Sequence, residues 1–207
     1  MNALHKLQYI SQGVDANTQW GHIRKALDHG AEWVQLRWKN APTASCLALA
    51  EKVKARCESY RATLIINDSI SIAQAVDADG VHLGLEDDSI EEARRILGNQ
   101  KIVGGTANTL AHVKQRMASG CDYIGLGPYR HTITKEKLSP ILGLRGYNDI
   151  LEQLHADTGH VPPIYAIGGI GLADVPDLLE LGVYGIALSQ VITETPACIT
   201  DFKKILA

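Results

Sequence analysis

Two hydroxyl side chains and an ammonium group lie within four residues of one another in the second half of the chain. They are Thr132, Thr134 and Lys135, and they close the segment Gly127–Lys135, which follows a strand-like apolar run. A hydrophobic core has no need of such a combination, whereas polar loops at strand ends commonly carry groups that bind phosphate. The segment is therefore predicted to be part of an active site and to act as its lid.

Three polar side chains alternate at the end of an earlier strand-like run. Gln35, Arg37 and Lys39 are spaced two residues apart, so a continuous strand would place all three on one face. An exposed edge strand alternates in the same way and is the alternative interpretation. In a barrel, helices cover the outer face, and the three side chains would instead converge on the mouth as a cradle for phosphate or pyrophosphate.

Carboxylates follow the next two strand-like runs. Asn67 and Asp68 come after the apolar run Leu64–Ile66, and Asp87 comes shortly after His82. Two carboxylates beside a cationic pocket suit Mg²⁺, which takes a few protein oxygens and completes its shell with phosphate and water. Asp68 and Asp87 are thus the predicted metal pair, and the alternative for Asp68 is a helix cap. A lone strand histidine such as His82 is more often a hydrogen-bonded core residue than a ligand or a base.

The later strand ends supply a hydroxyl group and glycines. Thr106 follows two glycines that allow a ligand to approach the backbone, and the alternative for this threonine is a helix cap. Gly168 and Gly169 follow the seventh run, and Leu188 and Ser189 end the eighth. Loops after the last two strands of a barrel recurrently bind phosphate through backbone N–H groups. The sequence therefore predicts two anion sites at one barrel mouth.

Eight strand-like runs alternate with helical patterns and would position these groups. The strands are predicted at Leu7–Gln12, Trp33–Lys39, Thr63–Asn67, Gly80–Gly84, Ile102–Thr106, Tyr123–Gly127, Ile164–Gly168 and Gly185–Ser189. Helices are predicted at Ser45–Tyr60, Ser89–Leu97, Leu110–Ser119 and Ala173–Leu181, with Asp88 or Ser89 as a cap. Strict alternation implies parallel strands joined by helices, so we expect an α/β fold, a (β/α)8 TIM barrel forming a single domain over residues 1–207. An open doubly wound sheet is the alternative.

Composition narrows the class of function. The formal net charge of −3 offers no general attraction for nucleic acid or an anionic membrane, so we expect small anionic ligands held by local cations. The four scattered cysteines and the lack of an apolar run of about 18 residues predict a cytoplasmic protein with reduced thiols. The sequence is compatible with either a monomer or a homo-oligomer. The sequence shows no Ser–His–Asp or Cys–His constellation, which favours chemistry that needs little acid–base machinery.

The order and spacing of these groups resemble the thiamine phosphate synthase family over essentially the whole chain. The motifs that carry the resemblance are Val34-Gln35-Leu36-Arg37 with Lys39, Ile66-Asn67-Asp68, Asp79-Gly80-Val81-His82-Leu83-Gly84 with Asp87, Gly104 with Thr106, Asp122-Tyr123-Ile124-Gly125 with Gly127-Pro128, Thr132-x-Thr134-Lys135 with Pro140 and Leu142-Gly143-Leu144, and Ala166-Ile167-Gly168-Gly169-Ile170. Each motif alone is weak, but together in this order they are specific.

The resemblance implies an enzyme that joins 4-amino-2-methyl-5-hydroxymethylpyrimidine diphosphate to hydroxyethylthiazole phosphate, giving thiamine phosphate and pyrophosphate by an SN1-like displacement. By position, the pyrimidine diphosphate would be held by Gln35, Arg37, Lys39, Asn67, Thr106 and Lys135, of which Arg37, Lys39 and Lys135 would be catalytic. Thr132, Thr134, Gly168, Leu188 and Ser189 would place the thiazole phosphate. The resemblance assigns Mg²⁺ to Asp68 and Asp87.

The chain departs from the family pattern at three places. Leu85 stands where many members carry Gln, Thr106 where many carry Ser, and Tyr129-Arg130-His131 where a Phe and a Pro are frequent. Arg130 and His131 have no assigned role. Two alternatives stay open: a paralogous thiazole tautomerase, which has a histidine near the position of Asn108, and a non-catalytic phosphometabolite-binding barrel. The metal carboxylates and the Thr-x-Thr-Lys loop favour the synthase.

Overall fold

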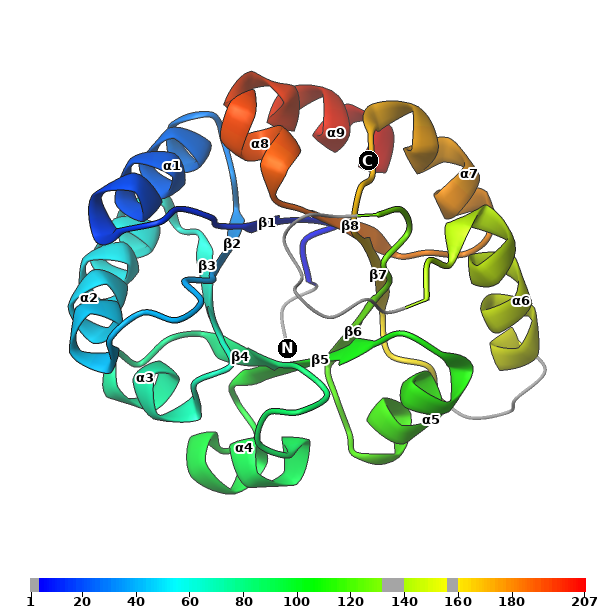
Figure 1. Ribbon diagram of the computed structural model, residues 1–207, viewed down its shortest axis with the longest axis horizontal. Coiled ribbons are helices and arrows are strands. Elements are labelled where there is room, and N and C mark those ends of the chain that lie inside the picture. Colours follow the sequence, from blue (N-terminus) through cyan, green and yellow to red (C-terminus); the bar gives the residue numbers. More distant parts are fainter. Residues whose placement is uncertain (1–3, 132–139, 156–159) are drawn as a thin grey trace.

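Eight parallel strands form a closed barrel in chain order, as the computed structural model shows in Figure 1. The structure describes residues 4–131, 140–155 and 160–207. The strands are β1 (Leu7–Ile10), β2 (Trp33–Leu36), β3 (Thr63–Asn67), β4 (Gly80–Leu83), β5 (Ile102–Ala107), β6 (Tyr123–Leu126), β7 (Ile164–Ile167) and β8 (Gly185–Leu188). Because β1 pairs with β8 as well as with β2, the sheet closes on itself. Closure excludes the doubly wound sheet and the edge-strand interpretation of β2.

Helices surround the barrel and cover the outer face of the strands (Figure 1). In the described residues they are α1 (Ala16–Asp28), α2 (Thr43–Tyr60), α3 (Ile70–Ala75), α4 (Ile90–Leu97), α5 (Leu110–Ala118), α6 (Gly143–His155), α7 (Val175–Glu180), α8 (Gln190–Glu194) and α9 (Ile199–Leu206), with short 3-10 turns at Leu172–Asp174 and Pro196–Cys198. None of these helices is both long enough and apolar enough to cross a bilayer. Both faces of each strand are covered by other parts of the protein, which explains why the strands appear in the sequence as short runs of apolar residues.

Polar side chains mark where several helices begin. The Asp15 carboxylate accepts a hydrogen bond from the Thr18 amide at 2.7 Å at the start of α1. The Ser89 hydroxyl accepts one from the Glu92 amide at 3.1 Å at the start of α4, so Ser89 and not Asp88 is the cap. The predicted helix Ala173–Leu181 is instead a 3-10 turn followed by α7, because proline in the first helical turn has no amide hydrogen to donate.

All eight strands begin at the predicted residue, but most end earlier than predicted. The largest error is in β2, which ends at Leu36 and not at Lys39. Arg37 and Lys39 therefore lie on the loop after the strand, where the Arg37 amide donates to the Ser11 hydroxyl at 2.9 Å. Strand pairing with β3 stops at Leu36, and the two cationic side chains belong to the segment that follows.

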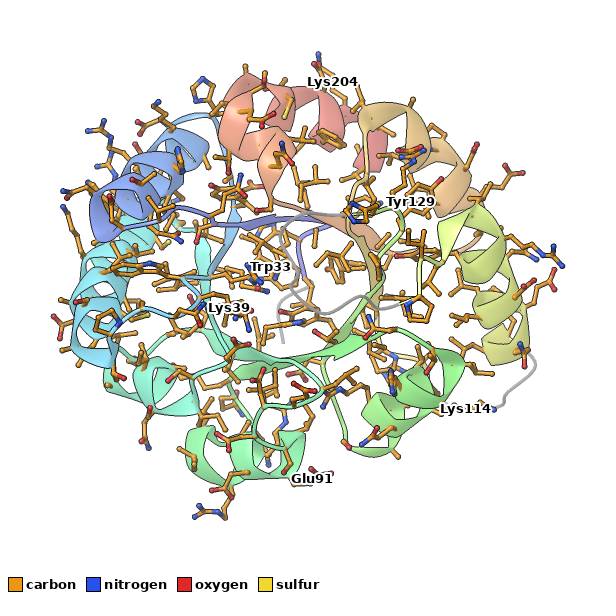
Figure 2. The ribbon with its side chains drawn as sticks, in the orientation of Figure 1. Trp33, Lys39, Glu91, Lys114, Tyr129 and Lys204 are labelled. Carbon is orange, nitrogen blue, oxygen red and sulfur yellow. The ribbon has the colours of Figure 1, made fainter. Side chains whose placement is uncertain are left out.

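Aromatic residues close the amino end of the barrel interior. Trp33, Tyr123 and Tyr165 pack edge to face with ring centroids 5.0 to 5.5 Å apart, and Ile65 completes this cluster. Trp33 and Tyr123 are the first residues of their strands, which sets the cluster at the amino end. Figure 2 places Trp33 at the centre of the ring of strands. Among the described residues these side chains fill the amino end, and barrels of this kind bind their ligands at the carboxyl ends of the strands.

Candidate active site

Two carboxylates and an ammonium group meet at the carboxyl ends of neighbouring strands. The Lys39 Nζ lies 2.8 Å from Oδ2 of Asp68, which follows β3 directly. The Asp87 carboxylate follows β4 and interacts with that of Asp68. Figure 2 shows Lys39 at the inner rim of the ring of helices, close to the strands. The structure thus brings together three of the residues that the sequence assigned to one anion and metal site.

The hydrogen bonds around Asp68 show which residue caps the following helix, α3. The Ser69 hydroxyl, and not the Asp68 carboxylate, accepts the Ile72 amide at 3.2 Å at the start of α3. Asp68 itself has a left-handed backbone with φ of 66°, and its amide donates to the His82 carbonyl at 2.8 Å. The helix-cap alternative for Asp68 is therefore wrong, and its side chain is directed to Lys39 and Asp87.

Asp87 is held in place by its own loop. Its Oδ2 accepts a hydrogen bond from the Gly84 amide at 2.6 Å. A Cβ atom on Gly84 would lie 2.8 Å from that same oxygen, so any other residue here would require the carboxylate to shift. Partial burial and the neighbouring Asp68 raise the pKa of Asp87, while the Gly84 amide and Lys39 act in the opposite direction. Two carboxylates thus share the neighbourhood of one lysine ammonium.

The Asp68–Asp87 pair has the donors that Mg²⁺ selects. Mg²⁺ is usually bound by one or two carboxylates, with waters and substrate phosphates filling the remaining positions. Within the described ranges, no group of three or more His, Cys, Asp or Glu side chains is arranged to hold a metal. A two-carboxylate site that a diphosphate completes agrees with both statements.

A hydrogen-bonded polar layer lies inside the barrel between the aromatic cluster and the mouth. Gln35 donates to Gln8 at 3.4 Å, Gln8 donates to the Tyr123 hydroxyl at 3.2 Å, and that hydroxyl lies 3.0 Å from Nδ1 of His82. The other ring nitrogen of His82 lies 3.0 Å from the Thr106 hydroxyl. His82 is therefore the buried, hydrogen-bonded residue that the sequence favoured.

Thr106 is not a helix cap, because Thr109 caps α5 by accepting the His112 amide at 3.2 Å. The Thr106 side chain belongs to the polar layer and is half-buried at the end of β5. Asn67 ends β3 and is half-buried beside Asp68. Sequence reasoning missed Gln8, although a glutamine within the apolar run Leu7–Ile10 was a signal of an inward polar position.

The described start of the segment Gly127–Lys135 is anchored to the loop after β7. The amides of Tyr129 and Arg130 donate to the carbonyls of Ile167 and Gly168, both at 2.9 Å. The Arg130 guanidinium binds both carboxylate oxygens of Asp174 and also the Gly169 carbonyl. Arg130 therefore ties two loops together. The predicted site residues Thr132, Thr134 and Lys135 lie outside the described residues.

Two glycines turn the chain sharply after β7. Gly168 and Gly169 have φ values of 94° and 68°, and a Cβ on Gly168 would lie 2.8 Å from the Pro128 side chain. Ser189 precedes the short helix α8, and its side chain makes no capping hydrogen bond. The Leu188 side chain is buried in the core, so a role in ligand binding would fall to its backbone. These loops are the second predicted anion site.

The Asp87→Asn variant is expected to be slightly more heat-stable than the unmodified protein without metal, with Tm about 1–3 °C higher near neutral pH. The raised pKa means that the native state binds the Asp87 proton more tightly than the unfolded chain does. Stability is therefore lost as pH rises from the ordinary carboxyl value through the raised value, and asparagine removes this loss.

Thermal melts from pH 4 to pH 8 measure the effect, with Asp88→Asn as the control on the adjacent exposed residue. The control is expected to leave the pH dependence of Tm unchanged. Equal melting profiles for Asp87→Asn and the unmodified protein would contradict a raised pKa of Asp87 in the folded state.

The chain is similar to known proteins in both sequence and fold. A family model described as thiamine monophosphate synthase matches residues 8–192. A thiamine-phosphate synthase of Flavobacterium johnsoniae is 53% identical over 202 residues, covering 98% of this chain and 92% of the relative. One from Phocaeicola vulgatus is 43% identical, covering 97% and 96% of the two chains. The solved structure of a thiamine phosphate pyrophosphorylase from Pyrococcus furiosus superposes with a TM-score of 0.80 at 29% identity, covering 98% and 97%.

Proposed function

Because this chain belongs to the thiamine monophosphate synthase family, we propose that the cluster of Lys39, Asp68 and Asp87 is where its reaction takes place. The reaction joins a pyrimidine diphosphate to a thiazole phosphate and releases pyrophosphate. The observation that carries the proposal is the contact of the Lys39 ammonium with Asp68, whose carboxylate interacts with that of Asp87 at the carboxyl ends of the strands. Burial in an apolar core would not stabilise these three charged side chains, whereas a diphosphate with a bound metal ion would.

The proposed diphosphate site consists of residues at the ends of β2, β3 and β5 and on the segment after β6. Its members are Gln35, Arg37, Lys39, Asn67, Thr106 and Lys135. Cationic side chains here would hold the diphosphate oxygens and neutralise the charge that develops as the leaving group departs. Mg²⁺ on Asp68 and Asp87 would add to this neutralisation when bound. Arg37, Lys39 and Lys135 are the proposed catalytic residues.

The proposed thiazole phosphate site is on the opposite side of the mouth, where the loops after β6, β7 and β8 meet. Its members are Thr132, Thr134, Gly168, Leu188 and Ser189. The contacts of Tyr129 and Arg130 with the loop after β7 support the proposal, because they join the two loops that would share this phosphate. Backbone amides and hydroxyls suit a phosphate monoester that must be positioned without being cleaved.

The proposed reaction is a displacement without proton transfer. The bond between the pyrimidine methylene carbon and the diphosphate oxygen breaks, and pyrophosphate leaves with the electron pair. The lone pair of the thiazole nitrogen then forms the new C–N bond to the methylene carbon. Both ring nitrogens of His82 are already hydrogen bonded, to Tyr123 and Thr106, which supports a mechanism in which this histidine is not a general base.

The protein is expected to form thiamine phosphate and pyrophosphate when given both phosphorylated substrates and Mg²⁺. Pyrophosphate release and product formation measure this directly, with omission of either substrate as the control. Product no greater than in a buffer blank would contradict the proposal and favour a non-catalytic binding barrel. Release of a rearranged thiazole without any thiamine phosphate would favour the tautomerase.

We also propose a cytoplasmic location with reduced thiols. All four cysteines are free, and burial raises the pKa of both Cys57 and Cys121 to about 12. Thiols with such pKa values are inert as nucleophiles. Cell fractionation would check the location, and recovery in a membrane or exported fraction would contradict it.

A further inference from the structure

A buried arginine on the outside of the barrel reaches the backbone of the proposed metal loop. Arg116 lies on α5 and is only 6% exposed. Its guanidinium donates to the carbonyls of Thr106 at 3.1 Å and Gly84 at 2.7 Å, with a longer contact of 3.4 Å to the Leu83 carbonyl. These three carbonyls stand at the carboxyl ends of β4 and β5. One side chain therefore joins two neighbouring strand ends at the active face.

The position of Arg116 is specified by the packing around it. A Cβ atom on Gly105 would lie 2.7 Å from Cδ of Arg116, so a glycine in β5 makes room for the side chain. The hydrogen bonds of Arg116 go to backbone oxygen atoms, and its charge also interacts with the Glu91 carboxylate, whose pKa it helps to lower. A buried guanidinium needs such acceptors, and the carbonyls at the strand ends need donors. Arg116 therefore supplies hydrogen-bond donors to the carbonyls at the two strand ends, and these carbonyls supply acceptors to its guanidinium.

Each main carbonyl partner of Arg116 belongs to a residue that also contacts the proposed site. The Gly84 carbonyl accepts from Arg116, and the Gly84 amide donates to Asp87 at 2.6 Å. The Thr106 carbonyl accepts from Arg116, and the Thr106 hydroxyl lies 3.0 Å from His82. A shift of the guanidinium would therefore move both the peptide that holds Asp87 and the strand that carries Thr106.

We propose that Arg116 is a positioning residue for the reaction, which fixes the Asp87 carboxylate through Gly84 and so sets the affinity of the site for a complex of a divalent cation with diphosphate. This inference rests on the proposed function, because it assumes that Asp87 binds the metal. Partners that orient a metal ligand typically change metal affinity or activity by about 10- to 100-fold when removed. Arg116 acts through Asp87 and touches no substrate.

Arg94 provides a matched control at the other end of the same barrel. It lies on α4 and donates to the carbonyls of Lys101 at 2.6 Å and Gly120 at 3.2 Å, and to the Asp122 carboxylate at 2.6 Å. Lys101 and Asp122 immediately precede β5 and β6, so these contacts are at the amino ends of the strands. Loss of Arg94 should destabilise the barrel without altering the proposed metal loop.

The test compares Arg116→Met and Arg94→Met by calorimetric titration with manganese pyrophosphate and, separately, with metal-free pyrophosphate. We expect Arg116→Met to bind the manganese complex about tenfold or more weakly. Its affinity for metal-free pyrophosphate should fall much less, because that titrant lacks the metal that Asp87 would hold and is affected only through Thr106. Both variants should lose thermal stability, but Arg94→Met should bind both titrants normally. Arg116→Lys, which keeps the charge and at least one donor, should recover part of the lost affinity.

Equal binding of manganese pyrophosphate by Arg116→Met and the unmodified protein would overturn the inference. A loss of the same size in Arg94→Met would also overturn it, because the effect would then follow general destabilisation. If Arg116→Met does not fold, Arg116→Lys takes its place in the test. Unchanged affinity of that variant for manganese pyrophosphate would refute the positioning role of Arg116. Failure of the unmodified protein to bind manganese pyrophosphate would refute the proposed metal site itself, which separates the two failures.

Discussion

The Asp68→Asn variant is expected to require much more Mg²⁺ and to lose about a hundredfold or more in kcat at Mg²⁺ concentrations that suffice for the unmodified protein. The substitution removes one of the two charges at the proposed metal site and leaves an amide of nearly the same shape. Asparagine also tolerates the left-handed backbone of this position, where φ is 66°. The expected loss therefore reports on charge and not on a distorted loop.

The chain contains a well-matched control for this variant. Asp77 also has a left-handed backbone, with φ of 49°, and its carboxylate lies 2.5 Å from the Lys101 ammonium. It precedes β4 at the amino end of the barrel, away from the proposed site. Initial rates of pyrophosphate release across a Mg²⁺ titration should change for Asp68→Asn and stay the same for Asp77→Asn. An unaltered titration for Asp68→Asn would remove Asp68 from the metal site.

The Lys39→Met variant is expected to lose about a hundredfold in kcat/KM for the pyrimidine diphosphate. Methionine keeps most of the length of the side chain but has no charge to offer the departing diphosphate. The Lys39 ammonium also contacts Asp68 at 2.8 Å and lowers the pKa of Asp87. Without it the pKa of Asp87 should rise further, so the carboxylate would ionise only at higher pH. The acid side of the pH–activity profile should therefore move to higher pH.

Steady-state rates from pH 5 to pH 9 measure both effects. Lys101→Met is the control, because it breaks the corresponding lysine–aspartate pair at the amino end of the barrel. That variant should keep both kcat/KM and the pH profile, since surface ion pairs contribute at most about 1 kcal/mol to stability. A kcat/KM for Lys39→Met within twofold of the unmodified value would show that Lys39 is only a solvated loop lysine.

Local sequence patterns were sufficient to predict the barrel. Short apolar runs such as Leu64–Ile66 alternate with amphipathic helices, and this alternation permits only parallel strands with helical crossovers. Every predicted strand start was correct. Strand ends were harder to predict, as at β2. A strand ends where its backbone pairing with the neighbouring strand stops, and the sequence of one strand does not show how far that pairing extends.

The proposed diphosphate and metal residues could also be predicted together. Carboxyl ends of parallel strands meet at one face, so Lys39, Asp68 and Asp87 had to be near neighbours in a barrel. The choice between a metal-binding role and a helix-capping role for Asp68 could not be made from the sequence. Asp68 and Ser69 are both good helix caps, and only the course of the chain after β3 shows that Ser69 takes this role.

The amino-acid sequence was enough to predict the architecture, from the periodicity of its apolar residues, and the family, from the order and spacing of its motifs. The folded structure was needed to show that Arg116 supports the loop of Asp87, that Arg130 joins two loops, and that Gln8 belongs to the polar layer with His82. Their partners are many residues away along the chain. Such contacts depend on the closing of the barrel, and no local pattern records them.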